Sequence, residues 1–137
     1  MGRNILGVVA GIVTWLVVAT AAGFIMRSSW PAYASVADAM TFTVSMMIAR
    51  LTIGALATLA MGFVTALITR STLARMIPGV LALLAFIPQH MMLWDKFPLW
   101  YHLTFLLSLV PLTYAGARLR TLVLGLRNTE HMHQMPT

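Results

Sequence analysis

The sequence contains no cysteine and only three acidic residues among 137, and charged residues of both signs make up just 9% of it. Without cysteine, the chain cannot form a disulfide, a thiolate metal site or a thiol nucleophile. An ordinary soluble domain carries about 25% charged residues. The shortage of charge therefore excludes an ordinary water-soluble domain as the class of protein.

Long apolar runs take the place of the missing charges. Hydrophobic residues make up 60% of the chain, and the mean hydropathy is +0.87. The runs 5–26, 47–69, 76–93 and 99–117 are each long enough for a helix to cross about 30 Å of hydrocarbon. Short connections favour antiparallel neighbours. We therefore expect an all-α integral membrane protein, with residues 1–137 forming one domain of four transmembrane helices in an antiparallel up-down-up-down bundle.

The basic residues predict the orientation of these spans. Two of them, Arg27 and Lys96, flank one side of the predicted membrane, and Arg50 falls within a span. The larger set flanks the other side: Arg3, Arg70, Arg75, Arg118, Arg120 and Arg127. Basic loops stay in the cytosol, so both termini are predicted to be cytoplasmic. The net charge of +6 therefore comes from basic residues that orient the spans in a lipid bilayer. For this reason we expect no nucleic-acid partner.

The pattern of four spans resembles that of small bacterial inner-membrane proteins. This resemblance implies a multi-pass protein of the bacterial inner (plasma) membrane, and it carries no site residues. Residues 127–137 are predicted to form a short cytoplasmic tail. Glu130, His131 and His133 are metal-capable side chains, but free tails of this kind are mostly solvated.

The second apolar run is too long for one perpendicular crossing. Ser35 is followed three residues later by Asp38, a spacing that resembles a capping box. We therefore expect a helical extension from residue 36, continuous with the span 47–69 and about 50 Å long at 1.5 Å per residue. Its first turns would either project above the outer surface of the membrane or bend along it.

Small residues recur at four-residue spacing in two spans. This spacing lets two helix backbones approach closely in lipid, where packing supplies much of the association. The pattern fits either packing inside one bundle or an interface between subunits. The predicted helix-packing residues are Gly7, Gly11, Gly54, Thr58, Gly62 and Ala66.

Polar residues gather near the predicted outer ends of the spans. The turn 94–98 is expected to be a tight outer hairpin, which brings the residues before and after it to similar depth. Arg50 is expected to pair with Asp38 or Asp95, because a cation inside a span needs a partner or the headgroups. The candidate outer polar cluster is Arg50, Gln89, His90, Asp95, Tyr101 and His102.

Three functions are compatible with these features. The first is a non-catalytic helix-packing or accessory subunit, oligomeric or bound to another membrane protein. The second is an oligomeric transporter or channel with the polar cluster at its entry. The third is a metal-, haem- or quinone-handling membrane protein that uses His90 and His102. No nucleophile motif is present, so the sequence favours a protein that is not an enzyme, and it predicts no catalytic residue, metal site or cofactor.

Overall fold

The computed structural model describes residues 1–133, with side chains as far as Gly125. Within these residues all regular structure is helical, which confirms the all-α prediction. The elements are α1 (Gly2–Ser29), α2 (Pro31–Ala37), α3 (Val44–Ile68), α4 (Thr72–Met92), a short 3-10 helix η1 (Trp94–Lys96) and α5 (Leu99–His133).

Three of these helices are long and apolar enough to cross a membrane. Their most apolar windows have mean hydropathies of 2.3 in α1, 2.1 in α3 and 1.5 in α4. The fourth predicted span lies in α5, which is not among the three. The findings therefore support a helical membrane protein with three candidate membrane-spanning helices.

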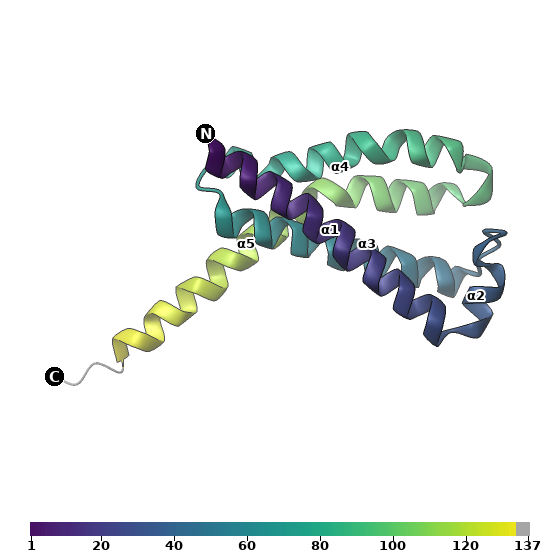
Figure 1. Ribbon diagram of the computed structural model, residues 1–137, viewed down its shortest axis with the longest axis horizontal. Coiled ribbons are helices and arrows are strands. Elements are labelled where there is room, and N and C mark those ends of the chain that lie inside the picture. Colours follow the sequence, from purple (N-terminus) through teal and green to yellow (C-terminus); the bar gives the residue numbers. More distant parts are fainter. Residues whose placement is uncertain (134–137) are drawn as a thin grey trace.

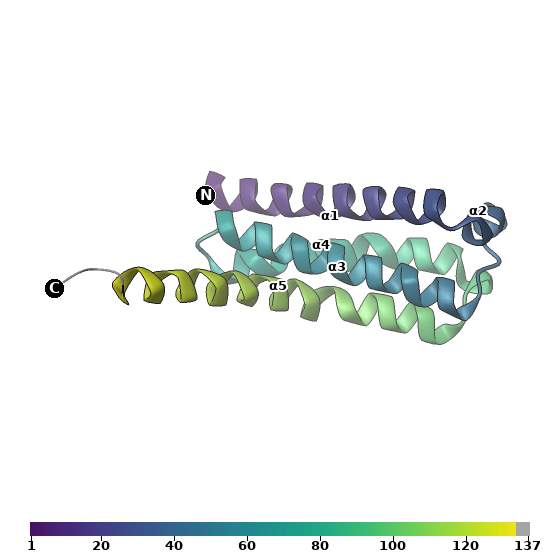
Figure 2. The same ribbon diagram turned by 90° about the horizontal axis from the view of Figure 1, so that it is seen from below.

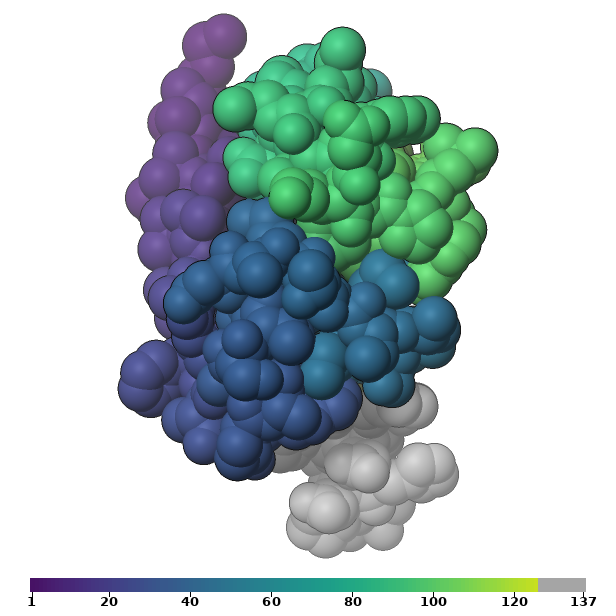
Figure 3. All heavy atoms as spheres, turned by 90° about the vertical axis from the view of Figure 1, so that its right-hand side faces the viewer, coloured from purple at the N-terminus to yellow at the C-terminus, as the bar shows by residue number. Residues whose placement is uncertain are grey.

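The four long helices lie side by side (Figures 1 and 2). One end of the molecule holds residues 30–43 and the α4–α5 connection 93–98, and we call it the turn end. Figure 3 looks onto this end, where the α2 segment in dark blue lies beside the green α4–α5 connection. The opposite end holds the N-terminus and the α3–α4 connection. The later part of α5 extends beyond the other helices (Figure 1).

Helix α3 is packed most closely against α5. A Cβ atom built on Gly62 would overlap the backbone carbonyl of Thr113, and one built on Gly116 would overlap the backbone carbonyl of Leu59. A Cβ on Gly54 would lie 2.9 Å from the ring of Phe105. Glycine is required here because any side chain would separate the two backbones.

Helix α1 packs on the neighbouring face of α3 in the same way. Gly7 lies against Thr69, and a Cβ on Gly11 would overlap the hydroxyl of Thr65. Trp15 lies one turn after Gly11 on α1. Its indole N–H donates to the hydroxyl of Thr58 on α3 at 3.1 Å. The small-residue stripes of α1 and α3 are therefore used within one chain, with Ala66 also fully buried.

The predicted extension of the second span is wrong. Helix α2 ends at Ala37, and Met40 adopts a left-handed φ of 56° in the turn that follows. Helix α3 starts anew at Val44, where the Thr43 side chain accepts a hydrogen bond from the backbone N–H of Met46 at 3.4 Å. Ser35 is no cap, since its hydroxyl donates to the carbonyl of Ala32 at 2.9 Å.

Two local signals explain this break. Pro31 stands at the first position of α2, where its fixed φ suits a helix start and its missing N–H costs nothing. Thr43 is a favoured N-cap residue. A short helix, a turn and a new capped helix therefore fit these residues better than one long helix does.

The other predicted boundaries lie close to those observed. Helix α4 ends at Met92 and α5 begins at Leu99, with η1 forming the connection. Helix α5 continues past the predicted end of the fourth span to His133. Residues 127–133 are thus helical, while residues 134–137 and the side chains of the predicted metal-capable tail lie outside the described part of the chain.

Candidate functional site: a pocket around Arg50

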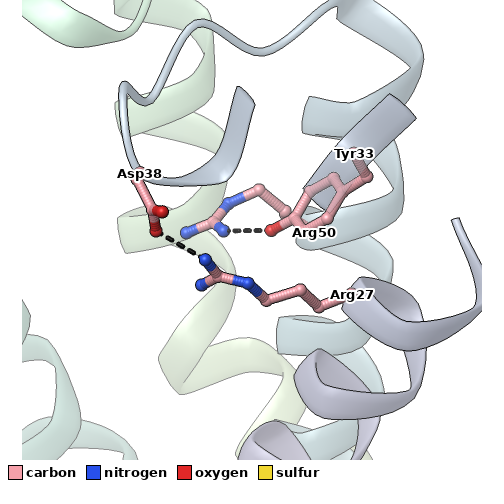
Figure 4. Close-up of polar contacts among 4 residues, drawn as sticks. All are labelled: Arg27, Tyr33, Asp38 and Arg50. Atoms are coloured by element: carbon pink, nitrogen blue, oxygen red, sulfur yellow. Dashed lines mark hydrogen bonds and ion pairs between the residues drawn. The ribbon is translucent and has the colours of Figure 1, made fainter. Parts of the chain in front are cut away.

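Arg50 lies at the turn end of α3, one helical turn before Gly54, and is half-buried. Its Nη1 donates to the hydroxyl of Tyr33 at 2.6 Å (Figure 4), and its Nε donates to the hydroxyl of Tyr101 at 3.3 Å. Tyr33 comes from α2 and Tyr101 from α5, and both side chains are buried. Three separate elements therefore fix the position of this guanidinium group.

The predicted ion pair of Arg50 is wrong. Asp38 instead pairs with Arg27 near the end of α1, at 2.5 Å (Figure 4). Asp95 is exposed on η1, and no ion pair links it to Arg50 within the residues that the structure describes. Asp38, the residue that follows α2, is thus engaged by Arg27. Among the residues that the structure describes, Arg50 has no carboxylate counter-ion.

Aromatic rings take the place of a counter-ion around Arg50. Tyr33, Phe42, Phe97 and Tyr101 form a continuous stack, with successive ring centroids 5.1, 5.9 and 4.6 Å apart. The Arg50 Cζ atom lies 4.8 Å from the centroid of Phe42. Cation–π contacts of this kind stabilise a guanidinium without neutralising its charge. The site therefore keeps a net positive charge.

His90 and His102 meet behind this group. Their Nδ1 atoms are 2.7 Å apart, so one imidazole donates a hydrogen bond to the other. Trp94 stacks on His102 and Phe105 on His90, each with centroids 4.9 Å apart. His102 is fully buried, and its Nε2 has no hydrogen-bond partner in the described part of the chain.

This arrangement gives the metal hypothesis no adequate donor set. A metal ion bound by both Nδ1 atoms would lie about 2.0–2.1 Å from each of them. In this structure the two Nδ1 atoms are instead hydrogen-bonded to each other. Among the described residues, no group of three or more histidine, aspartate or glutamate side chains could hold a metal ion. The pair is instead a buried polar contact that joins α4 to α5.

A pocket of about 230 Å³ opens beside Arg50. Four residues of the predicted polar cluster line it, namely Arg50, Gln89, His90 and Tyr101, whereas His102 lies behind His90 and Asp95 stands apart. The remaining lining residues are mostly apolar or aromatic, and they come from the five α-helices and the α4–α5 connection: Trp15, Ala19, Gly23, Met26, Tyr33, Ile53, Gly54, Phe86, Leu93, Phe97 and Phe105.

Sequence patterns do not identify three further residues of this site. Tyr33 is only one of several aromatic residues near the predicted outer surface. Phe42 falls within the predicted helical extension, and Trp15 interrupts the small-residue pattern of the first span. The contacts of Tyr33 and Phe42 with Arg50 depend on how the segment 30–43 folds back, and the place of Trp15 in the pocket lining depends on how α1 packs on α3.

A second, apolar cavity of about 270 Å³ lies between α1 and α4. Met61 of α3 belongs to its floor, and Leu16 and Leu81 belong to its two walls. We call this cavity the α1–α4 groove. Trp15 and Phe86 line both the groove and the Arg50 pocket, and their ring centroids are 5.0 Å apart. The pocket and the groove are therefore neighbours across this pair of rings.

The interior between the pocket and the opposite end is closely packed. The hydroxyls of Thr58, Thr65 and Thr113 each donate to a carbonyl of their own helix, at 2.7, 2.8 and 2.7 Å. Met61 and Leu109 fill the space near them and are almost fully buried. In the described core, no row of free polar groups leads from the pocket through the bundle, which gives the transport hypothesis no path within one chain.

The chemistry available in the pocket is that of recognition. A guanidinium offers several N–H donors in a planar fork that suits a carboxylate or a phosphate. The side chains around it include no hydroxyl or thiol placed against a base, as a covalent mechanism needs. Comparison with protein-family models, curated proteins and solved structures gives no match to this chain, so its function rests on this geometry.

Proposed function

We propose that this chain is a non-catalytic accessory subunit of a bacterial inner membrane that holds an acidic group in the Arg50 pocket. In this proposal α1, α3, α4 and α5 cross the bilayer as an antiparallel up-down-up-down bundle, and both termini are cytoplasmic. The acidic group belongs to a lipid or to another membrane protein. The high hydropathy of α1, α3 and α4 supports the membrane setting.

The distribution of charged and aromatic residues supports this orientation. Arg3 lies at the end of the molecule opposite the turn end, and its Nε donates to the carbonyl of Ile68 at 2.8 Å. Arg70 and Arg75 lie at the same end, around the α3–α4 connection. Five aromatic residues occupy the turn end: Trp30, Tyr33, Phe42, Trp94 and Phe97. Basic residues inside and aromatic residues at the interface are the usual pattern of membrane proteins.

The observation that carries the proposal is the half-buried Arg50 guanidinium, which has no carboxylate partner in the part of the chain that the structure describes. A buried charge is costly unless it is paired. The two tyrosine hydroxyls satisfy some of its N–H donors, but they do not neutralise the charge. The pocket beside it is therefore suited to an acidic group that enters from outside the chain.

The packing residues limit how the subunit would meet a partner. Gly7, Gly11, Gly54 and Gly62 are already covered by neighbouring helices of the same chain. A second copy or another membrane protein would therefore have to use other surfaces. The pocket at the turn end is one such surface, and it offers specific polar chemistry.

Native mass spectrometry from a mild nonionic detergent tests this function. The wild type is expected to carry a stoichiometric acidic species, either a lipid or a protein. Arg50→Gln should lose it, because glutamine keeps hydrogen-bonding capacity but has no charge. Lys96→Gln is the matched control, since Lys96 is exposed at the same end and does not line the pocket. The same bound species in all three proteins would refute the proposal.

A further inference from the structure

The Arg50 pocket and the α1–α4 groove adjoin and differ in chemical character. Arg50, Gln89 and Tyr101 make one part polar, whereas the groove is lined almost entirely by carbon. The two parts adjoin at Trp15 and Phe86. A ligand that fills both must carry a charged group at one end and a hydrocarbon segment at the other.

The length of the site can be followed along α3. Arg50 marks the polar part, and Met61 in the floor of the groove lies on the same helix. At 1.5 Å per residue these two positions are separated by roughly 16 Å along the helix axis. A short acid cannot reach from one to the other, but an extended acyl chain can.

The groove is open on the side that faces away from α3. Leu16 on α1 is 54% exposed and Leu81 on α4 is 44% exposed, whereas Met61 beneath them is 1% exposed. Helix α1 also diverges from α4 toward the turn end (Figure 1). In a bilayer, this open side would face lipid chains, so an acyl chain can enter sideways without passing through the bundle.

The charge at the polar part matches a phospholipid. No described carboxylate pairs with Arg50. The proposed orientation puts the turn end at the outer headgroup level, where the phosphates of the outer leaflet lie. A guanidinium binds phosphate with short, charge-assisted hydrogen bonds. A protein partner could supply an acidic side chain to the pocket, but it would leave the apolar groove unfilled.

We propose that a phospholipid of the outer leaflet occupies this site, with its phosphate at Arg50 and one acyl chain in the α1–α4 groove past Trp15 and Phe86. The second acyl chain stays in the surrounding bilayer. This inference rests on the proposed function, because it identifies the acidic group that the Arg50 pocket holds.

Three probes that divide the lipid into its parts test the inference on the full-length protein. Palmitoyl lysophosphatidate carries both the phosphate and a long chain, glycerol phosphate carries only the phosphate, and monopalmitoyl glycerol carries only the chain. After delipidation, native mass spectrometry from a mild nonionic detergent should show one lysophosphatidate per chain. Each of the other two probes should bind at least about tenfold more weakly.

Two kinds of variant separate the two parts of the site. Arg50→Gln should weaken lysophosphatidate binding by at least about tenfold and leave monopalmitoyl glycerol unchanged. Ala82→Phe fills the groove. It should weaken the binding of lysophosphatidate and leave the binding of glycerol phosphate unchanged. Ala115→Phe is the matched control, because Ala115 is exposed on α5 outside both cavities. Ala85→Phe, at a more exposed position of the groove, repeats the test if Ala82→Phe does not fold.

The outcomes distinguish this inference from the proposed function. If glycerol phosphate binds as tightly as lysophosphatidate and Arg50→Gln abolishes both, the acidic pocket stands but the acyl groove is refuted. If lysophosphatidate binding survives both groove variants, the groove is likewise refuted. If Arg50→Gln changes the binding of none of the three probes, the lipid site is refuted. An unchanged set of copurifying species in that variant would refute the proposed function as well.

Discussion

The middle of the molecule and its turn end are built from different residues. In the middle, glycines let α3 pack closely against α5 and against α1. At the turn end, rings and a guanidinium separate the helices and leave a pocket. The comparison teaches that small residues give this chain its rigidity and that large amphipathic residues give it a place to bind.

Helix α3 links the two regions. Gly54 contacts Phe105 of α5 and also lines the Arg50 pocket, so the close packing begins one turn below the charge. Thr58, one turn further, is fully buried and receives the hydrogen bond from Trp15. The position of Trp15 at the border of pocket and groove is therefore set by the packed middle.

The largest effect is expected in the packed middle. Gly62→Ala places a Cβ into the backbone carbonyl of Thr113 and should lower the free energy of unfolding by about 3 kcal/mol, the upper end for overpacking, because a backbone oxygen cannot move alone. Gly23→Ala, where a Cβ meets nothing, should stay within about 1 kcal/mol of wild type. Unfolding by sodium dodecyl sulfate in mixed micelles measures both. Equal stability of the two variants would show that α3 and α5 are not in backbone contact.

The histidine pair should give the next largest effect. His102→Leu leaves the Nδ1 of His90 without its partner and should cost about 2 kcal/mol of unfolding free energy. His90→Leu should behave similarly, and the double variant should cost less than the two singles together, since it leaves no ring unpaired. The same unfolding measurement applied to all three variants gives the coupling energy. Strict additivity would mean that the two rings do not share a hydrogen bond.

A smaller effect is expected for Tyr33→Phe. This change removes the hydroxyl that accepts from Arg50 Nη1, and a hydrogen bond to a charged group contributes about 1.5 kcal/mol at the low end of its range. Tyr114→Phe is the control, because Tyr114 is exposed on α5. Thermal unfolding in detergent should separate the two variants. If both behave as the wild type, the Tyr33 hydroxyl contributes nothing measurable, and Arg50 is held by the Tyr101 hydroxyl and the aromatic stack.

The smallest effect is expected for the exposed ion pair. Arg27 and Asp38 side chains are 51% and 86% exposed, so solvent screens their attraction, and Arg27→Gln or Asp38→Asn should each cost less than about 1 kcal/mol. Thermal unfolding at low and high salt measures this. A much larger loss for Asp38→Asn than for Arg27→Gln would instead indicate that Asp38 acts on Arg50.

Much of the helical layout was predictable because it follows from local patterns. The apolar runs predicted α1 and α4 to within a few residues, and the Trp94–Pro98 turn falls where the apolar pattern is interrupted. The break before α3 was missed because apolar residues such as Met40 and Phe42 continue through it. Hydropathy does not reveal a left-handed turn in an apolar segment.

The candidate site was predictable only in part. One pocket is lined by Arg50, Gln89, His90 and Tyr101. Their grouping was predictable because residues at equal depth on neighbouring helices come together. The counter-ion of Arg50 was assigned wrongly, since Asp38 turns toward Arg27 instead. The tyrosine of α2 was missed, because its contact depends on how the segment 30–43 folds back over the helices.

The sequence by itself determined that most of this chain is apolar helix, where the helices turn, and which residues are small enough for close packing. These properties depend on hydropathy and on local steric rules, which act over a few residues. Only the tertiary structure decided that Arg50 has two tyrosine partners and, as far as Gly125, no carboxylate partner. It alone decided that α1 and α4 leave a groove nearby. Those features depend on the angles between helices, which the side chains of all four long helices set together.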